Sequence, residues 1–175
     1  MSTKRSVLVT GATGQQGGAV ARALLSRGHR VKALTRKPDS DAARQLKSAG
    51  ADVVTGDLGD AASVLKAASG LDAMFLMGNP YEAGTEEETR QGIIAAEAAK
   101  DAGVGHLIYS SVADANKKTG IPHFESKYLV EKHVGGCGAY VRMVRPRRLR
   151  RRYRRIAQGF FGGPLAQFCR MGARI

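Results

Sequence analysis

The sequence predicts an α/β protein built on a doubly wound parallel β-sheet. Apolar runs typical of strands alternate with helical patterns from residue 6 to residue 144, and this alternation predicts parallel βαβ units. The first apolar run breaks into three spaced glycines, Gly11, Gly14 and Gly17, as the strand-to-helix turn of such a sheet does. We therefore expect a Rossmann sheet in strand order 3-2-1-4-5-6, with a ligand at the carboxyl ends of the strands.

Three strands and three helices are expected in the first half of the chain. Val20 and Leu24, four residues apart, mark the sheet-facing side of the first helix, which Gly28 ends. Asp60 is placed to cap the third helix. The strands are expected at residues 6–10, 30–36 and 51–55, and the helices at residues 15–27, 41–48 and 61–68.

The second half continues the same alternation. Residues 71–77 form a nearly continuous apolar run, as expected of a strand that is covered on both faces. The long helix after it opens with three glutamates, residues 86–88, which favour the positive end of the helix dipole. The remaining strands are expected at residues 105–110 and 139–144, and the helices at residues 85–102 and 121–134.

The positive charge of the chain is concentrated at its end. The net charge is +13, yet eleven arginines and no acid or lysine follow residue 141, which leaves +2 for residues 1–141. Like charges as dense as those of residues 147–155 repel one another and predict no fold. We expect residues 1–146 to form one domain and residues 147–175 to be an Arg-rich tail. A nucleic-acid arm is the minor alternative for this tail, but only Tyr153 interleaves the run for base stacking, so nucleic acid is not an expected partner.

No stretch of the chain predicts a secretory signal or a membrane span. The apolar run after Lys4 and Arg5 is three residues long, far shorter than either segment requires. Cys137 and Cys169 have no CxxC partner and no histidine cluster, which argues for a reducing compartment and against a metal site. We expect a cytoplasmic protein with no metal and no membrane partner.

The glycine turn predicts a site for a dinucleotide. Glycines at G-x-x-G-x-x-G spacing permit a tight turn, a bare backbone beside a pyrophosphate, and close packing of helix on strand. The pyrophosphate would rest on the helix N-terminus, where unpaired N–H groups face an anion. The cofactor-binding residues expected in this turn are Gly11, Thr13, Gly14, Gln15, Gln16 and Gly17.

The end of the second strand bears on which cofactor fits. An acid there accepts a hydrogen bond from a ribose 2′-OH, whereas an arginine accommodates a 2′-phosphate. The sequence has Arg36 and Lys37 at this point and no acid beside them, so NADP(H) is preferred over NAD(H). The alternative is that both are ordinary solvated charges after a strand.

Other candidates follow the third and fourth strands. Asp57 could present its carboxylate to the adenine amino group while Leu58 lies against the ring; the alternative for Asp57 is a turn aspartate that bonds its own backbone. Asn79, after the fourth strand, would line the middle of the cofactor, or simply form a turn.

The fifth strand and the helix after it supply the candidate catalytic residues. Ser110 and Ser111 end the strand, where a hydroxyl could face the nicotinamide or a substrate carbonyl, although serines also form turns. His123 and Lys127 lie one helical turn apart on a shared face. Lys127 could reach the nicotinamide ribose hydroxyls, and His123 could equally be a helix-start residue without catalytic duty.

These residues resemble the NmrA-like group of atypical short-chain dehydrogenases, which includes redox-sensing regulators and NAD(P)H-dependent quinone reductases. The resemblance covers about residues 5–146 and rests on Thr10-Gly11-Ala12-Thr13-Gly14, Gln16-Gly17-Gly18, Thr35-Arg36, Gly56-Asp57, Ser110-Ser111-Val112 and Pro122-His123-Phe124-Glu125-Ser126-Lys127-Tyr128. Ordinary short-chain dehydrogenases have Tyr-x-x-x-Lys at the last of these, with the tyrosine as general acid. His123 stands in its place, so the resemblance does not imply proton donation by tyrosine.

The resemblance implies an NADP(H)-binding protein of redox-sensing or regulatory type, with a protein partner if it is a regulator. The alternative is an NAD(P)H-dependent oxidoreductase that reduces small quinones or related carbonyls, and the sequence leaves open whether catalysis occurs. Family members continue past an Arg-Pro pair, here Arg145-Pro146, into a substrate-binding portion. We expect that portion to be missing, and we interpret the arginine run as the product of a shifted reading frame.

Overall fold

The described structure is a six-stranded parallel sheet in the order β3-β2-β1-β4-β5-β6, which confirms the predicted Rossmann order. It is a computed structural model and describes residues 4–136 and 140–144. The strands are β1 (Ser6–Val9), β2 (Arg30–Thr35), β3 (Asp52–Thr55), β4 (Ala73–Leu76), β5 (His106–Ser110) and β6 (Tyr140–Val144). The helices are α1 (Gln15–Leu25), α2 (Asp41–Ser48), α3 (Ala61–Ala68), α4 (Pro80–Ala83), α5 (Thr85–Asp101) and α6 (Pro122–Gly136), with a 3₁₀ turn η1 at Ala115–Lys117.

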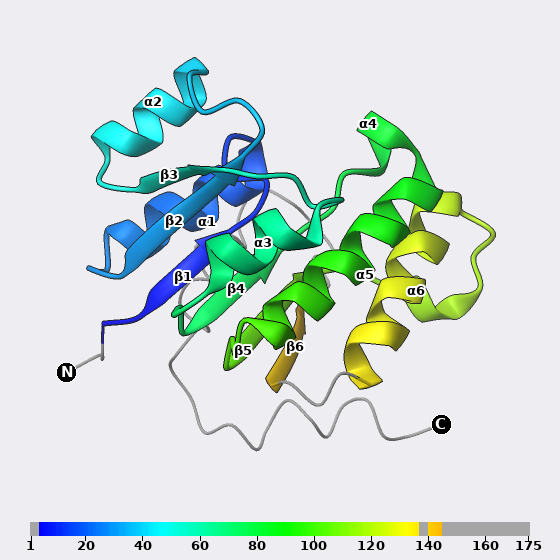
Figure 1. Ribbon diagram of the computed structural model, residues 1–175. Helices are drawn as coiled ribbons and strands as arrows, with labels where there is room; N and C mark the ends of the chain where they lie inside the picture. The colour runs from blue at the N-terminus through cyan, green and yellow to red at the C-terminus, as the bar shows by residue number, and fades with distance from the viewer. Residues whose placement is uncertain (1–3, 137–139, 145–175) are drawn as a thin grey trace.

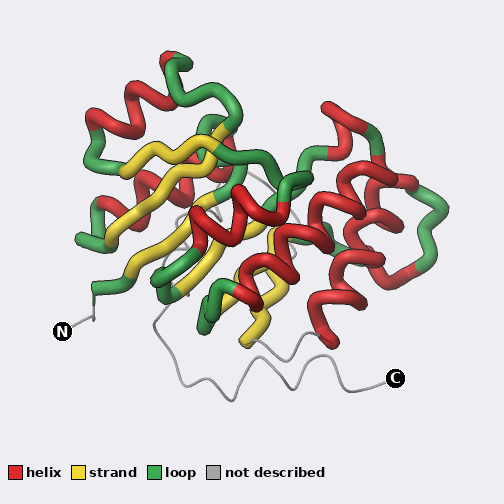
Figure 2. The backbone as a smooth tube through the Cα atoms, in the orientation of Figure 1, coloured by secondary structure: helices red, strands yellow, loops and turns green. Residues whose placement is uncertain are grey.

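Helices cover the sheet in two layers (Figures 1 and 2). Successive residues of β1 alternate between them: Val7 and Val9 pack in the apolar cluster shared with α1 and α2, and Leu8 packs in the cluster shared with α3, α5 and α6. All four residues of β4 are buried. The prediction that the apolar run around this strand is covered on both faces is therefore confirmed.

The strand order places a crevice beside the end of β1. This strand pairs in parallel with β2 on one side and β4 on the other, with Val9 opposite both Ala33 and Phe75. The connections after β1 and β4 therefore leave toward opposite faces of the sheet and open a space between them at its carboxyl edge. The glycine turn follows β1 at this point.

Each element expected within the described residues is present, and two short ones were missed. The predicted cap at Asp60 is confirmed: its Oδ1 accepts hydrogen bonds from Ala62 N at 3.0 Å and Ser63 N at 3.3 Å. The missed helix α4 is a single turn, in which Asn79 Oδ1 accepts from Tyr81 N at 3.2 Å and Pro80 takes the first helical position. An Asn-Pro pair is a helix-start signal that the sequence does contain.

The missed turn η1 had no such signal. It is flanked by Asp114 and Lys118, which have φ angles of 64° and 48°. Residues other than glycine rarely adopt this left-handed backbone conformation. In the described part of the chain, no helix has the length and apolarity needed to cross a membrane. The predicted boundary at residue 146, the tail after it, Cys137 and Cys169 lie outside the described residues and stay predictions.

Candidate functional site

The glycine turn has the geometry that its spacing predicts. Gly11 has a φ of +58°, and Gly14 N donates a hydrogen bond to Gly11 O at 3.0 Å. A Cβ on Gly17 would lie 2.3 Å from Gly11 O, so this helix residue packs directly on the turn and tolerates no side chain. Gly14 caps α1 without a side-chain hydrogen bond, and no acid stands in the first turn. The first N–H groups of α1 thus remain available to an anion.

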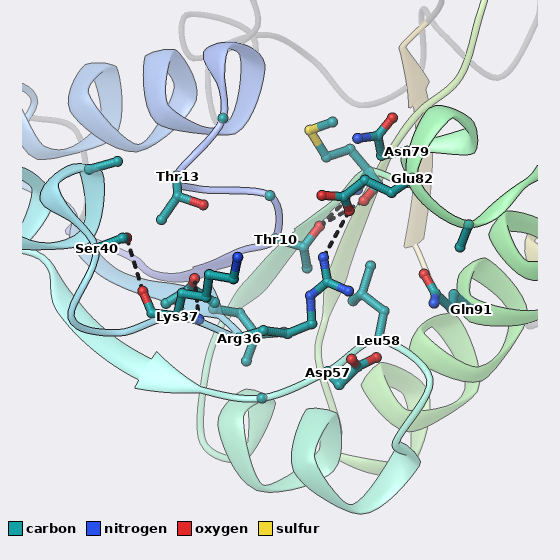
Figure 3. Close-up of a pocket in the computed structure, with 18 residues that line it drawn as sticks. Thr10, Thr13, Arg36, Lys37, Ser40, Asp57, Leu58, Asn79, Glu82 and Gln91 are labelled. Carbon is teal, nitrogen blue, oxygen red and sulfur yellow. Dashed lines mark hydrogen bonds and ion pairs between the residues drawn. The ribbon is translucent and has the colours of Figure 1, made fainter.

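A cleft of about 440 Å³ opens beside this turn, at the carboxyl edge of the sheet (Figure 3). Eight of the predicted cofactor-binding residues line it: Gly11, Thr13, Gly14, Arg36, Lys37, Asp57, Leu58 and Asn79. Ser40, Met77, Glu82 and Gln91 also line it and were not predicted. The structure therefore brings together in one cleft the turn and the residues that follow β2, β3 and β4.

Arg36 does not stand alone at the mouth of this cleft. Its Nη2 lies 2.8 Å from Oε2 of Glu82 on α4, and the two side chains are 56% and 60% exposed. In Figure 3 the guanidinium of Arg36 extends across the cleft toward Glu82. The sequence shows no acid beside Arg36, but the fold supplies one from 46 residues further along the chain.

Asp57 and Asn79 use their side chains within the protein. Asp57 Oδ1 accepts from Gly59 N at 2.7 Å, which is the turn geometry given above as the alternative. Asn79 Oδ1 caps α4. Both residues nevertheless line the cleft, so a local structural role and a place beside the ligand coexist.

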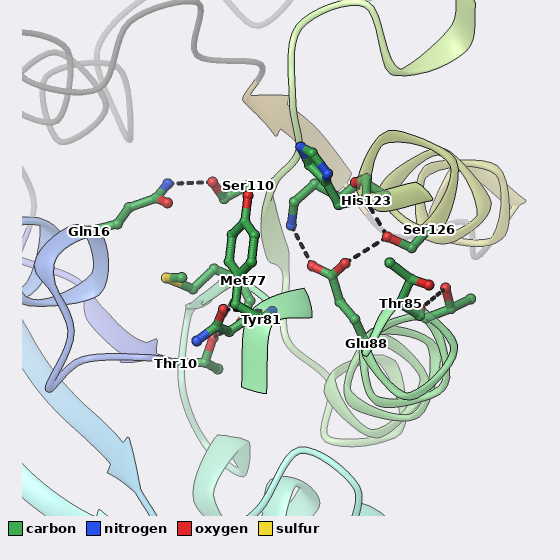
Figure 4. A network of polar contacts seen from close by, with 12 residues as sticks. Thr10, Gln16, Met77, Tyr81, Thr85, Glu88, Ser110, His123 and Ser126 are labelled. Atoms are coloured by element: carbon green, nitrogen blue, oxygen red, sulfur yellow. Dashed lines mark hydrogen bonds and ion pairs between the residues drawn. The ribbon is translucent and has the colours of Figure 1, made fainter. Parts of the chain in front are cut away.

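The remaining candidates do not line this cleft and lie in the first turn of α1, at the end of β5 and in the first two turns of α6. Gln16 Nε2 donates to Ser110 Oγ and so joins α1 to β5 (Figure 4). Ser111 is buried, and its Oγ has no hydrogen-bond partner. The structure therefore brings Gln16 and Ser110 together, while Gln15, Gln16, Gly17, Ser110, Ser111, His123 and Lys127 are not among the residues that line the cleft.

The ammonium of Lys127 pairs with the buried carboxylate of Glu88. The sequence predicted only a favourable interaction of this glutamate with the helix dipole. Lys127 Nζ lies 2.6 Å from Glu88 Oε1, with side-chain exposures of 13% and 1%, and Ser126 Oγ donates to Glu88 Oε2 at 2.7 Å (Figure 4). A Cβ on Gly78 would lie 2.7 Å from Glu88 Cγ, so the bare backbone after β4 makes room for this side chain. The lack of a side chain at Gly78 thus leaves the space that the Glu88 side chain occupies.

A signal for the burial of Glu88 does exist in the sequence. Glu88, Gly92, Ala95, Ala96 and Ala99 recur at helical spacing, and all of them are buried. A glutamate within a stripe of small apolar residues lies on the face that packs inward. Its partner Lys127 follows 39 residues later, and no local pattern pairs the two.

Two aromatic groups flank this pair. Tyr109 lies under Lys127, with Nζ 5.9 Å from the ring centroid, and its hydroxyl is buried without a hydrogen-bond partner. Burial, together with the Glu88 and Glu131 carboxylates, raises the pKa of the Tyr109 phenol far above its ordinary value, so this tyrosine stays protonated. His123 contacts Phe124 edge to face at 4.9 Å and lies 5.9 Å from the ring of Tyr81, which is 83% exposed.

Comparison with known proteins shows to which family the chain is similar. A sequence model of the NmrA-like family matches residues 3–154. The NmrA-like family domain-containing oxidoreductase notA of Aspergillus sp. is 38% identical over an alignment of 148 positions, and the match covers 78% of this chain and 44% of that protein. The chain thus spans less than half the length of this curated relative.

Solved structures agree with the sequence comparison. Triphenylmethane reductase of Citrobacter sp., complexed with NADP(H), has a TM-score of 0.71 at 27% identity over 80% of this chain and 48% of that one. NmrA, a negative transcriptional regulator solved with NADP and with NAD, has a TM-score of 0.71 at 26% identity over 81% of this chain and 45% of its own. The NADPH-dependent quinone oxidoreductase QOR2 of Escherichia coli, complexed with NADPH, has a TM-score of 0.70 at 27% identity over 79% and 48%. With its glycine turn, its sheet order and these matches, the chain belongs to the NmrA-like family.

Proposed function

We propose that this protein binds a nicotinamide dinucleotide at its glycine turn, with NADP(H) preferred over NAD(H). The observation that carries the proposal is the cleft itself, because it joins the uncapped N-terminus of α1 to two cations after β2. The pyrophosphate would lie on the turn of Gly11, Gly14 and Gly17, and the 2′-phosphate beside Arg36 and Lys37. The NADP(H), NADPH and NAD complexes of the structural relatives support the ligand class.

The proposed site extends from this cleft toward β5 and α6. Asp57 and Leu58 would contact the adenine, Thr13, Gln15 and Asn79 the middle of the cofactor, and Gln16, Ser110 and Lys127 the nicotinamide half. The unpartnered hydroxyl of Ser111 supports a polar ligand near the end of β5, because a buried hydroxyl without a hydrogen bond costs about 1–3 kcal/mol. Lys127 would donate to the ribose while Glu88 fixes its ammonium.

Binding is tested by calorimetric titration of the full chain with NADPH, NADP, NADH and NAD. Gly14→Val, which puts a branched side chain where even a Cβ lies 3.3 Å from Gly11 O, is expected to abolish binding. Gly105→Ala is the control, since a Cβ there meets only Asp72 O at an ordinary 3.6 Å. If none of the four nucleotides binds the unmodified chain, the proposal is wrong.

A bound dinucleotide would serve either regulation or catalysis, and we propose regulation as the first of these two functions. His123 stands where a short-chain dehydrogenase has its proton-donating tyrosine, and its ring packs against Phe124 and near Tyr81, which supports a sensor that holds NADP(H) for a protein partner. The similarity to the negative transcriptional regulator NmrA supports the same reading.

The second candidate is reduction of a small quinone or related carbonyl, with Lys127, Ser111 and His123 as the catalytic residues. The bound cofactor would supply the hydride. The similarity to quinone oxidoreductase and triphenylmethane reductase favours it. Oxidation of NADPH followed at saturating cofactor with 1,4-benzoquinone and 1,4-naphthoquinone separates the two: binding without turnover supports the sensor, and turnover by the unmodified chain supports the reductase.

A further inference from the structure

The ion pair at the mouth of the cleft joins the segment after β2 to helix α4. Arg36 follows β2, Glu82 lies on α4, and both line the cleft with 2.8 Å between their charged groups. Every other charge that lines the cleft comes from Lys37 or Asp57. The Arg36 guanidinium, which the proposed function assigns to a 2′-phosphate, therefore already has an anionic partner within the protein.

The placement of Glu82 is fixed by the backbone around it. Pro80 and the Asn79 cap start α4 directly after the turn that follows β4. Gly84 ends it with a φ of +86°, a conformation that glycine adopts without strain, and α5 begins at the next residue. A helix of four residues held at both ends keeps Glu82 at the rim of the cleft.

We propose that Glu82 is a specificity-determining residue, which lowers the preference for a 2′-phosphorylated dinucleotide by competing with the phosphate for Arg36. The inference rests on the proposed function. Glu82 accepts a hydrogen bond from Nη2 of Arg36, and a phosphate that binds a guanidinium bidentately uses two of its N–H groups. Because the carboxylate and the phosphate also repel each other when they share one guanidinium, the 2′-phosphate competes with Glu82 for Arg36. A dinucleotide with a free 2′-OH brings no such charge and leaves the ion pair intact.

The exposure of the pair sets the size of this competition. Both side chains are more than half exposed, and an ion pair in such a setting stabilises a protein by about 0–1 kcal/mol. Its removal is therefore worth up to about fivefold in affinity. Because salt screens exposed charges, the effect shrinks as ionic strength rises.

Lys37 gives the site a second cation that Glu82 does not occupy. Its backbone N–H donates to Thr35 Oγ1 at 3.1 Å, and among the described residues its ammonium forms no ion pair. Lys37 remains available to the phosphate while Arg36 is engaged. Glu82 thus reduces the preference for the phosphorylated dinucleotide without removing it.

The test is a binding cycle with NADPH and NADH on four versions of the full chain: unmodified, Glu82→Gln, Arg36→Ala and the double variant. We expect Glu82→Gln to bind NADPH three- to fivefold more tightly at low salt and NADH within twofold of the unmodified chain. In the Arg36→Ala background the same change should alter NADPH affinity less than twofold. Glu86→Gln, an equal charge change on an exposed residue of α5, should leave both affinities within twofold.

Every other outcome contradicts either this inference or the proposed function. An equal gain with and without Arg36 would mean that Glu82 does not act through that residue, and a gain as large in Glu86→Gln would reduce the effect to net charge. No change of the NADPH to NADH ratio in Glu82→Gln sinks the inference while leaving the proposed function intact. Absence of dinucleotide binding in every version, the unmodified chain included, refutes the proposed function instead.

Discussion

Two cation–glutamate pairs stand at opposite ends of the proposed ligand path, and they differ in what water can reach. Arg36 and Glu82 are 56% and 60% exposed, whereas Lys127 and Glu88 are 13% and 1% exposed, although the charged atoms approach similarly, at 2.8 Å and 2.6 Å. Distance alone does not separate an exchangeable contact from a fixed one. The difference in burial does separate them, because it decides whether the charges of a broken pair lie in water or in the protein interior.

Breaking the exposed pair leaves two solvated charges, at a cost of about 0–1 kcal/mol. Breaking the buried one leaves a carboxylate among apolar residues, at about 3–5 kcal/mol. The exposed pair can therefore yield its arginine to a ligand, while the buried pair fixes Lys127 on α6 against α5. In the proposed complex the adenosine end of the site would therefore rearrange when the ligand binds, whereas the contacts of Lys127 are already formed without it.

Loss of Lys127, the ammonium partner of the buried Glu88 carboxylate, should produce the largest effect on stability. In Lys127→Met, the Glu88 carboxylate keeps Ser126 as its donor but loses its ammonium, and we expect about 3–5 kcal/mol less free energy of unfolding, measured with urea. The double variant Lys127→Met with Glu88→Gln should regain part of this loss, because no charge is then buried unpaired. A strictly additive double variant contradicts a buried ion pair.

Gly17→Ala should have the next largest effect, on binding as well as folding. Its Cβ would lie 2.3 Å from Gly11 O and 2.7 Å from Thr10 O, so the turn must move. We expect about 1–3 kcal/mol of destabilisation and at least about a tenfold loss of NADPH affinity, since a displaced turn no longer fits the pyrophosphate. Gly105→Ala, which has room for its methyl group, should change neither; equal behaviour of the two variants would refute the close packing of α1 on the turn.

A change of ionic strength should have the smallest effect, and it should act on the exposed ion pair more than on the buried one. Raising salt from about 50 mM to 500 mM shortens the screening length severalfold, so NADPH affinity should fall a fewfold more than NADH affinity. The unfolding difference between the unmodified chain and Lys127→Met should stay nearly constant over this range, because buried charges are screened little. The reverse pattern would contradict the assignment of the exposed and buried pairs.

Local patterns predicted the parts of the fold and site that depend on neighbouring residues. The spacing of Gly11, Gly14 and Gly17 predicted a strand, a turn and a helix start, and the alternation of elements predicted the sheet order. The charges after β2 placed Arg36 and Lys37 at the cleft. These signals succeed because a turn or a strand end is specified within a few residues.

Both ion pairs escaped prediction because they depend on the assembled fold. Glu82 and Glu88 reach their partners over 46 and 39 residues of sequence, and neither distance follows from periodicity. Glu88 did carry a sign of burial in the stripe of small residues along α5. Glu82 carried none beyond the Asn79-Pro80 start of α4, which a search for helix caps would find.

The most direct test of the account is the ratio of NADPH to NADH affinity in the unmodified chain and in Arg36→Ala, measured by titration in the same low-salt buffer. We predict that the unmodified chain prefers NADPH and that Arg36→Ala reduces this preference by about tenfold, in line with the loss of one charge-assisted phosphate contact, while NADH affinity stays within about twofold. An unchanged ratio in Arg36→Ala would show that the cations after β2 do not select the cofactor.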